Sequence, residues 1–278
     1  MSGKSTGTSV GAGVAAAAGL AAATGVAFYG AQVPTAQIYG RTVCREPGAG
    51  KKLCLTYDDG PNPAWTPNLL DLLDEHDARA TFFLIGKWSE REPALIREVV
   101  ARGHAIGNHT FTHPTMPAKT DQRIREELDA CREAVEAAGV TFSTVAGRML
   151  MRPPYGRRRP GTLRVLKEKG YIGITWSITG YDWRPHTTAD AITRRCLKAG
   201  EGDIILLHDG YDQHPAYDRH RSVETTKNLL EHYRPQGYDF VTVPELVEAA
   251  GTESRYAAPV RGPVPWQGSG GPGQSPAA

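Results

Sequence analysis

Two short motifs bring together residue types that are suited to chemistry. Asp58 and Asp59 directly follow residues 53–57, an apolar run rich in β-prone side chains. Adjacent carboxylates repel each other, so both ionise easily only where a cation or hydrogen-bond donors lie nearby. His109 and His113 lie four positions apart, a spacing that on a helical turn brings both imidazoles within reach of one ion. Taken alone, the first motif also fits a turn, and the second fits a pair of surface histidines.

Each motif follows a predicted strand, which favours a joint metal site over two unrelated features. One carboxylate and two imidazoles form a ligand set that leaves open positions for water. Zinc is the first choice for such a set, and cobalt, manganese or nickel fit the same ligands. The four cysteines include no Cys-x-x-Cys pair, so neither a thiolate zinc site nor a thioredoxin-type redox site is indicated. Cys44 and Cys54 fit either a disulfide of an exported protein or small buried thiols.

Two further polar motifs come after other predicted strands. Arg152 begins an Arg-Pro-Pro-Tyr sequence that ends at Tyr155. Because proline restricts the backbone, the Arg152 side chain and the Tyr155 amide can be held rigidly. Asp182 directly precedes Trp183 in the second motif. Taken alone, the first motif also fits an ordinary proline-rich loop, and the second fits a surface acid beside a half-buried indole.

His208 lies at the mouth of another predicted strand, after the apolar run 204–207. A single histidine there is often structural, but this one joins four other polar strand ends. The arginines at 157–159 are expected to form a solvated loop that can touch an anionic glycan. We interpret the remaining histidines as surface or structural residues: His76, His104, His186, His214, His220 and His232.

Short β-prone runs alternate with single amphipathic helices along most of the chain. The predicted strands span residues 53–57, 81–85, 104–108, 149–152, 171–177, 204–207 and 240–243. The predicted helices span residues 66–76, 94–102, 121–138, 162–169, 189–199, 222–233 and 245–250. This order predicts an α/β fold with a parallel sheet, and about seven units favour a barrel over an open sheet. In both architectures the functional groups collect where strands end, as all five motifs do here.

Composition excludes some classes of protein. The chain has 278 residues with a formal net charge of +2, which excludes binding to nucleic acid driven by bulk charge. With 40% hydrophobic and 22% charged residues, it can bury a core, so wholesale disorder is excluded.

The two ends of the chain differ in composition from the region between them. Residues 5–40 carry no charged side chain and follow Lys4, and residues 10–31 are rich in alanine and glycine. This layout predicts a secretory signal or an uncleaved membrane anchor, and therefore a secreted or cell-surface protein. We divide the chain into a signal or anchor with linker (1–42), one folded domain (43–250), and a disordered, proline- and glycine-rich tail (251–278).

Taken together, the motifs resemble the polysaccharide deacetylases of the NodB-like family, carbohydrate esterase family four. The resemblance runs from about residue 51 to residue 250, and its strength lies in the order of five motifs. They are Thr-Tyr-Asp-Asp-Gly (56–60), His-Thr-Phe-Thr-His (109–113), Arg-Pro-Pro-Tyr (152–155), Tyr-Asp-Trp (181–183) and Leu-Leu-His (206–208). The fourth motif of the family often begins with an acid three positions before its Asp-Trp aspartate, where this chain has Thr179.

The resemblance implies a distorted (β/α) barrel that removes acetyl groups from N-acetylated sugars, or from O-acetylated xylan, with a divalent metal. It also implies a role for each matching residue. These are Asp59, His109 and His113 as metal ligands, Asp58 as general base, His208 as general acid, Arg152 and Asp182 as their respective partners, Trp183 and Leu206 as walls of the acetyl pocket, and the Tyr155 amide as an oxyanion donor.

The implied chemistry is coherent, since an amine leaves poorly unless an acid protonates it. Peptidoglycan, a chitin-like polymer and xylan all stay open as the substrate, and we expect a monomer. Two alternatives have different functions: a catalytically idle carbohydrate-binding wall protein on the same fold, and an amidohydrolase of small molecules. Loss of the base, a ligand or the acid would favour the idle protein, and the sequence retains all of them.

Overall fold

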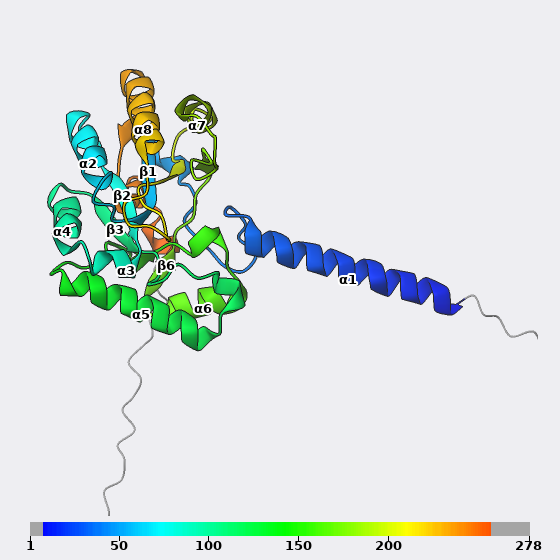
Figure 1. Ribbon diagram of the computed structural model, residues 1–278. Helices are drawn as coiled ribbons and strands as arrows, with labels where there is room; N and C mark the ends of the chain where they lie inside the picture. Colours follow the sequence, from blue (N-terminus) through cyan, green and yellow to red (C-terminus); the bar gives the residue numbers. More distant parts are fainter. Residues whose placement is uncertain (1–7, 257–278) are drawn as a thin grey trace, which may run out of the picture.

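The predicted alternation of strands and helices forms a mainly parallel sheet in the computed structural model, which describes residues 8–256 (Figure 1). The strands are β1 (Lys52–Gly60), β2 (Ala80–Leu84), β3 (Ala105–Asn108), β4 (Thr144–Val145), β5 (Arg148–Met151), β6 (Tyr171–Gly173), β7 (Ile178–Thr179), β8 (Ile204–His208) and β9 (Asp239–Phe240). The α-helices are α1 (Thr8–Gln32), α2 (Thr66–Glu75), α3 (Gly86–Ser89), α4 (Pro93–Ala101), α5 (Asp121–Ala137), α6 (Pro160–Glu168), α7 (Ala189–Cys196), α8 (His220–Tyr233) and α9 (Val243–Ala249).

Strand β1 lies in the interior of the sheet, whose order is β4-β5-β3-β2-β1-β8-β7 with β6 beside β5 and β9 beside β1. Among the described strand pairs, only β4 and β5 run antiparallel. The register of β1 and β8 sets Asp58 opposite His208. The register of β3 and β5 sets Asn108 opposite Met151, directly before two of the predicted motifs. The carboxyl ends of these parallel strands therefore lie at the same end of the sheet.

Residues 171–177 do not form the single strand that the sequence predicted. The first part of this segment is β6, which pairs with β5, and the chain then passes to β7, which pairs with β8. One stretch of chain thus pairs first with β5 and then with β8, so the prediction of a single strand over residues 171–177 was wrong. The continuous chain from β6 to β7 thus connects β5 with β8 on opposite sides of the strand order, in agreement with the predicted distorted (β/α) barrel.

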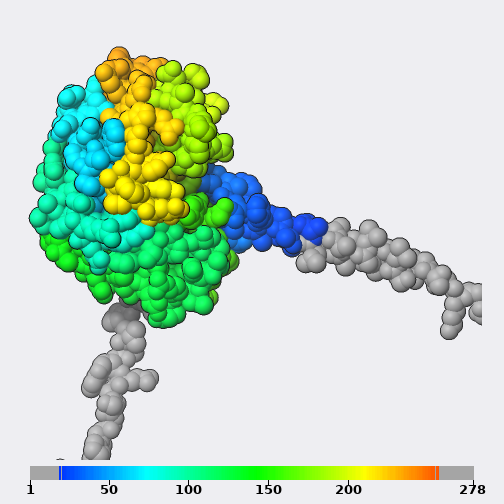
Figure 2. Space-filling view, in the orientation of Figure 1, coloured from blue at the N-terminus to red at the C-terminus, as the bar shows by residue number. Residues whose placement is uncertain are grey.

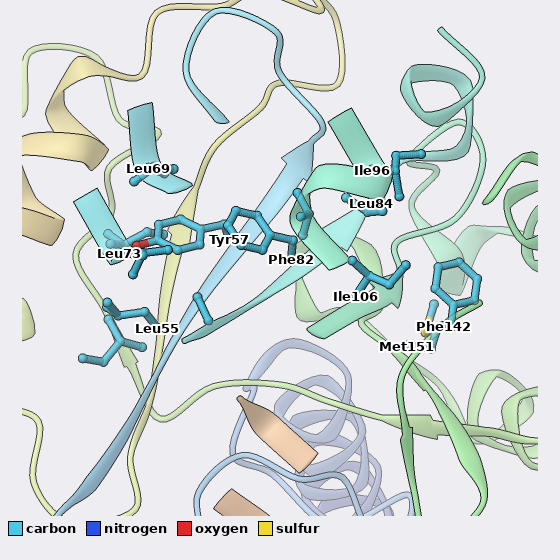
Figure 3. Close-up of a cluster of buried hydrophobic side chains, with 14 of the residues drawn as sticks. Leu55, Tyr57, Leu69, Leu73, Phe82, Leu84, Ile96, Ile106, Phe142 and Met151 are labelled. Carbon is cyan, nitrogen blue, oxygen red and sulfur yellow. The ribbon is translucent and has the colours of Figure 1, made fainter. Parts of the chain in front are cut away.

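Alternation along the strands separates the core from the functional face. Leu55 and Tyr57 of β1 point into a hydrophobic cluster with α2, in which the rings of Tyr57 and Phe82 stack with centroids 5.0 Å apart (Figure 3). Successive side chains of a strand point to opposite faces, so Thr56 and Asp58 point away from this cluster. Both of them accept a hydrogen bond from the buried guanidinium of Arg152. The apolar packing thus fixes the strands that carry the polar groups.

Helix α1 extends away from the domain (Figures 1 and 2). Within residues 8–256, no helix combines the length and the apolar character that a membrane span requires.

Packed structure extends beyond both predicted ends of the folded domain. Thr42 is buried before residue 43, and Tyr256 is buried after residue 250. Thr252 Oγ1 donates a hydrogen bond to Glu46 Oε2 at 2.9 Å, and the Tyr256 hydroxyl donates to the same carboxylate. The first six residues of the predicted tail therefore pack on the domain, while residues 257–278 lie outside the described part.

The structure also tests the expectations for Arg158 and for the cysteines. Arg158, expected in a solvated loop, is only 1% exposed, because its guanidinium is surrounded by backbone carbonyl groups. All four cysteines lie within the described residues and are free thiols, so Cys44 and Cys54 do not form a disulfide in this structure.

Candidate active site

Asp58 and Asp59 lie at the carboxyl end of β1, where the strand is irregular. The register of β1 against β2 shifts between Asp58 and Gly60, and Asp59 has a left-handed backbone with φ of 74°. Adjacent side chains of a regular strand point to opposite faces, and this irregularity removes that constraint. His109 Nε2 lies 3.7 Å from Asp58 Oδ2 and 3.5 Å from Asp59 Oδ1. Both carboxylates therefore face the same histidine.

His109 and His113 come together on a loop, so the predicted helical turn was wrong. Thr110 and His113 have left-handed backbones with φ of 67° and 61°. Asn108 Oδ1 accepts a hydrogen bond from the Thr110 amide at 2.8 Å, and Thr110 Oγ1 accepts one from the His113 amide at 3.1 Å. Glu127 of α5 also accepts hydrogen bonds from two amides of the loop. These side-chain contacts hold a backbone that a β-branched residue such as threonine rarely adopts.

Asp59, His109 and His113 fit a divalent metal ion. Their ligand atoms all lie within 4.8 Å of one another, and all three residues are buried. Asp59 Oδ1 lies 3.3 Å from His113 Nε2, and it has no hydrogen-bond partner in the described part of the chain. His109 Nδ1 donates a hydrogen bond to Arg152 O at 2.7 Å, which leaves Nε2 free to act as a ligand.

The electrostatics of this cluster also suit a cation. Burial by itself raises the pKa of Asp59, but the two histidines outweigh this effect and hold the pKa well below its ordinary value. An ionised, buried carboxylate with an unpartnered oxygen is a group that a metal ion would satisfy.

Arg152 is fully buried and holds the Asp58 carboxylate in place. Its Nη1 donates hydrogen bonds to Asp58 Oδ1 at 2.7 Å and to Thr56 Oγ1 at 2.8 Å, and Nη2 donates to Thr175 O at 3.1 Å. The guanidinium also stacks on Phe83, with its carbon 4.1 Å from the ring centroid. Asp58 therefore has one fixed oxygen, and its second oxygen faces His109.

His208 forms a second pair with Asp182 on the other side of the site. Its Nδ1 lies 2.9 Å from Asp182 Oδ1, and its backbone amide donates to Asp182 Oδ2 at 2.8 Å. Ser222 of α8 donates to the same carboxylate oxygen at 2.8 Å. Burial by itself lowers the pKa of His208, but the Asp182 carboxylate outweighs this effect and raises the pKa above its ordinary value.

The departure from the family pattern at Thr179 has a local consequence. Thr179 Oγ1 accepts a hydrogen bond from the Tyr181 amide at 3.3 Å, and Tyr181 has φ of 58°. This hydroxyl thus supports the turn that carries Asp182, whose carboxylate still reaches His208.

One cavity of about 560 Å³ is lined by one member of each pair, Asp58 and His208, and by the candidate metal ligands Asp59, His109 and His113. Asp182 and Arg152 lie behind its wall, each bonded to a residue that lines it. The Trp183 ring lies 5.2 Å from the His208 ring, and the Tyr155 ring lies 4.6 Å from the His113 ring, between centroids. The predicted residues that line the cavity are Asp58, Asp59, His109, His113, Tyr155, Trp183, Leu206 and His208.

Sequence reasoning missed several residues of this site. Asp212 Oδ2 lies 3.4 Å from His113 Nδ1, and Gln32 lines the cavity although it lies far outside the predicted domain. Asp209, next to His208, is buried outside the cavity, and burial raises its pKa to about 7. Asp212 could have been predicted, because it is an acidic residue in the loop directly after His208. The composition around Gln32 gives no indication of a functional site.

Comparisons with known proteins identify the relatives of this chain. A family model described as polysaccharide deacetylase matches residues 45–174. A peptidoglycan-N-acetylglucosamine deacetylase of Bacillus cereus is 35% identical over 203 residues, which cover 72% of this chain and 90% of the relative. A chitooligosaccharide deacetylase of Sinorhizobium fredii is 40% identical over 178 residues, which cover 62% of this chain and 78% of the relative.

The fold has similar counterparts among solved structures. The crystal structure of a peptidoglycan N-acetylglucosamine deacetylase superposes with a TM-score of 0.67 and 30% sequence identity. The match covers 74% of this chain and 92% of that structure. The chain therefore belongs to the polysaccharide deacetylases of carbohydrate esterase family 4, which carry the NodB homology domain and are hydrolases.

Proposed function

We propose that this hydrolase removes acetyl groups from N-acetylglucosamine residues of a cell-wall or extracellular polysaccharide. The observation that carries the proposal is the register of β1 and β8, which sets Asp58 and His208 opposite each other in one cavity beside a cluster of metal-ligating residues. The similarity to peptidoglycan and chitooligosaccharide deacetylases supports the same substrate class. Acetate and a free amino sugar would be the products.

Asp59, His109 and His113 are the residues that would hold a divalent metal, with zinc as the first choice. When bound, such an ion would polarise the acetyl carbonyl and lower the pKa of a nearby water molecule.

Asp58 would act as the general base. It would accept the proton of the attacking water as the new carbon–oxygen bond forms at the acetyl carbon. Arg152 fixes Asp58 Oδ1, so the proton would go to the oxygen that faces His109. The Tyr155 amide would donate a hydrogen bond to the oxyanion that develops on the former carbonyl oxygen.

His208 would act as the general acid. An amide nitrogen leaves as a poor anion unless it is protonated, and His208 would deliver that proton as the carbon–nitrogen bond breaks. Asp182 favours the protonated imidazole and orients it through the contact of Oδ1 with Nδ1, while its Oδ2 accepts a hydrogen bond from the His208 backbone amide. Trp183 and Leu206 would enclose the acetyl methyl group, since both line the cavity beside His208.

Acetate release from a set of polymers tests the proposed substrate class. Metal-loaded protein would be incubated with peptidoglycan, with chitin oligomers and with acetylated xylan, and acetate would be measured over time. We expect release from one or both of the N-acetylglucosamine polymers. Release from xylan alone would reject N-acetylglucosamine as the target, and release from none of them would reject the polysaccharide proposal.

Metal binding by the full chain should depend on His113 and, to a smaller degree, on Asp212. Removal of one ligand in His113→Ala should abolish the binding of about one ion per chain. Asp212→Asn should weaken metal affinity by about 10–100-fold, as expected for a carboxylate that orients a ligating histidine. Calorimetric titration of metal-free protein with zinc measures both effects.

The matched control is His220→Gln, which changes an exposed histidine outside the cavity. Its zinc affinity should equal that of the wild type. Full zinc occupancy in His113→Ala would contradict the ligand assignment.

We also propose that the protein is exported and works in the cell wall. The uncharged segment after Lys4 supports this, as does the similarity to relatives that act on peptidoglycan. Cleavage at the small-residue pattern Ala21-Ala22-Ala23 would leave Gln32 in the mature protein, and an uncleaved segment would keep the protein at the cell surface. Mass spectrometry of protein from the medium and from the cell surface would give the mature N-terminus, and recovery only from the cytoplasm would reject export.

A further inference from the structure

Residues 33–36, which follow α1, are joined to the domain by one buried arginine. The Arg158 guanidinium donates hydrogen bonds to the backbone carbonyls of Val33 at 3.0 Å and Pro34 at 3.1 Å, and also to that of Ala36. It further donates to Gly156 O at 2.9 Å, within its own loop. This segment therefore packs against the loop that carries the Arg-Pro-Pro-Tyr motif.

The buried Arg158 side chain needs the carbonyl groups of residues 33–36 as hydrogen-bond acceptors. It is 1% exposed, and burial lowers its pKa. No carboxylate of the described residues forms an ion pair with it, so backbone carbonyl oxygens are the acceptors that stabilise its buried charge. Three of those four carbonyls belong to residues 33–36. Loss of these acceptors would leave a buried charge without partners and strongly lower the stability of the folded domain. The segment and the loop therefore stabilise each other.

Further hydrogen bonds fix the chain on both sides of this contact. The Arg158 amide donates to Ala31 O at 3.1 Å, and Thr175 Oγ1 donates to Pro34 O at 2.9 Å. The Tyr39 hydroxyl donates to Ala27 O at 2.6 Å, near the carboxyl end of α1. The end of α1 and the segment after it are therefore held at a defined position on the domain.

This attachment brings Gln32 to the active-site cavity. Gln32 is half-buried and lines the cavity together with Tyr155, Arg157 and the metal-ligating histidines. In residues 8–256 its carboxamide has no hydrogen-bond partner of its own. A neutral carboxamide offers two donor hydrogens and an acceptor oxygen, which match the hydroxyl and N-acetyl groups of a sugar.

We propose that Gln32 is a substrate-binding residue that contacts a sugar beside the one that loses its acetyl group, and that Arg158 positions it. The proposal rests on the proposed function. Because the contacted sugar is not the one that reacts, the contact contributes to the binding of an oligomer and not to the hydrolysis of the acetyl group itself. A small acetate ester has no neighbouring sugar, so it does not make this contact.

Steady-state kinetics of full-length Gln32→Ala tests the proposal. On an N-acetylglucosamine tetramer, KM should rise by about 2- to 10-fold, the range expected for one or two hydrogen bonds, with kcat close to the wild-type value. On an aryl acetate, kcat/KM should stay unchanged. Thr35→Ala is the matched control, because Thr35 is an exposed residue of the same segment outside the cavity.

Arg158→Met tests the positioning role. It should raise KM for the tetramer by a similar factor, and the double variant with Gln32→Ala should show no further rise, since both changes act on the same contact between Gln32 and the sugar. A full additive loss in the double variant would overturn the role of Arg158.

The outcomes separate this inference from the proposed function. Equal losses on the tetramer and on the aryl acetate, or no loss on either, would overturn the role of Gln32 in an enzyme that is still active. A wild-type protein that releases no acetate from the tetramer would overturn the proposed function and this inference with it.

Discussion

Asp58→Asn should lower the deacetylation rate by about 10²–10⁴-fold on an N-acetyl sugar and on an aryl acetate alike. Both reactions begin with the attack of water on an acetyl carbon, and both need a base to accept its proton. Asparagine can still accept the hydrogen bond that Arg152 donates at 2.7 Å, so the buried guanidinium keeps a partner. The variant should therefore fold and bind metal. Rates on both substrates, together with elemental analysis of the purified variant, measure these expectations.

Asp209→Asn is the matched control for this change. Asp209 is also a buried aspartate beside the active site, but it lies outside the cavity, and its Oδ2 accepts a hydrogen bond from Thr66 at 2.6 Å. Its pKa of about 7 means that the carboxyl is largely neutral at pH 6, as an amide is. This variant should retain activity at pH 6. An active Asp58→Asn would contradict the assignment of the base.

His208→Ala should damage amide cleavage more than ester cleavage. On an N-acetyl sugar oligomer, loss of the general acid should cost about 10²–10⁴-fold in kcat. An activated aryl acetate has a better leaving group, which departs without a proton. The reduction of kcat on this ester should therefore be much smaller. The ratio of the two losses is the measurement. Equal losses on both substrates would remove the case for His208 as the leaving-group acid.

The pH dependence of kcat provides a second test of the same role. A general acid must be protonated, so amide cleavage should fall as pH rises through the raised pKa of His208. Asp182 is the group that raises this pKa, through a contact of 2.9 Å to Nδ1. Asp182→Asn should therefore move the descending limb to lower pH. An unchanged limb would indicate that another group controls it.

The strand ends were predictable from the sequence because parallel strands align their carboxyl ends. Asp58 and His208 follow apolar runs about 150 positions apart, and the in-register pairing of β1 and β8 sets them opposite each other. The strand and helix order also gave the barrel, since single helices between strands require parallel pairing.

Features that depend on unusual backbone conformations were not predictable. The spacing of His109 and His113 suggested a helical turn, but the loop instead passes through left-handed residues that side-chain hydrogen bonds hold. The predicted strand 171–177 ends at Gly173 as β6, and β7 begins only at Ile178; which strands they pair with is decided by the whole sheet. Residue composition does not contain that information.

Long-range contacts of polar side chains were also missed. Arg158 stands in a run of three arginines, a pattern typical of a solvated loop, and becomes buried only because residues 33–36 surround it. The same contact brings Gln32 to the cavity from a segment that composition assigned to a signal or linker. Such a contact joins parts of the chain about 125 positions apart, and neither part shows it alone.

The most direct test of the central claim is the stoichiometry of products from an N-acetylglucosamine tetramer. Acetate and free primary amine would be measured in the same reaction with metal-loaded wild-type protein. Hydrolysis of the acetamide bond releases one acetate for each amine, so the two should rise together in a ratio of about one. Absence of both products, or acetate without amine, would contradict the assignment of this chain as an N-deacetylase.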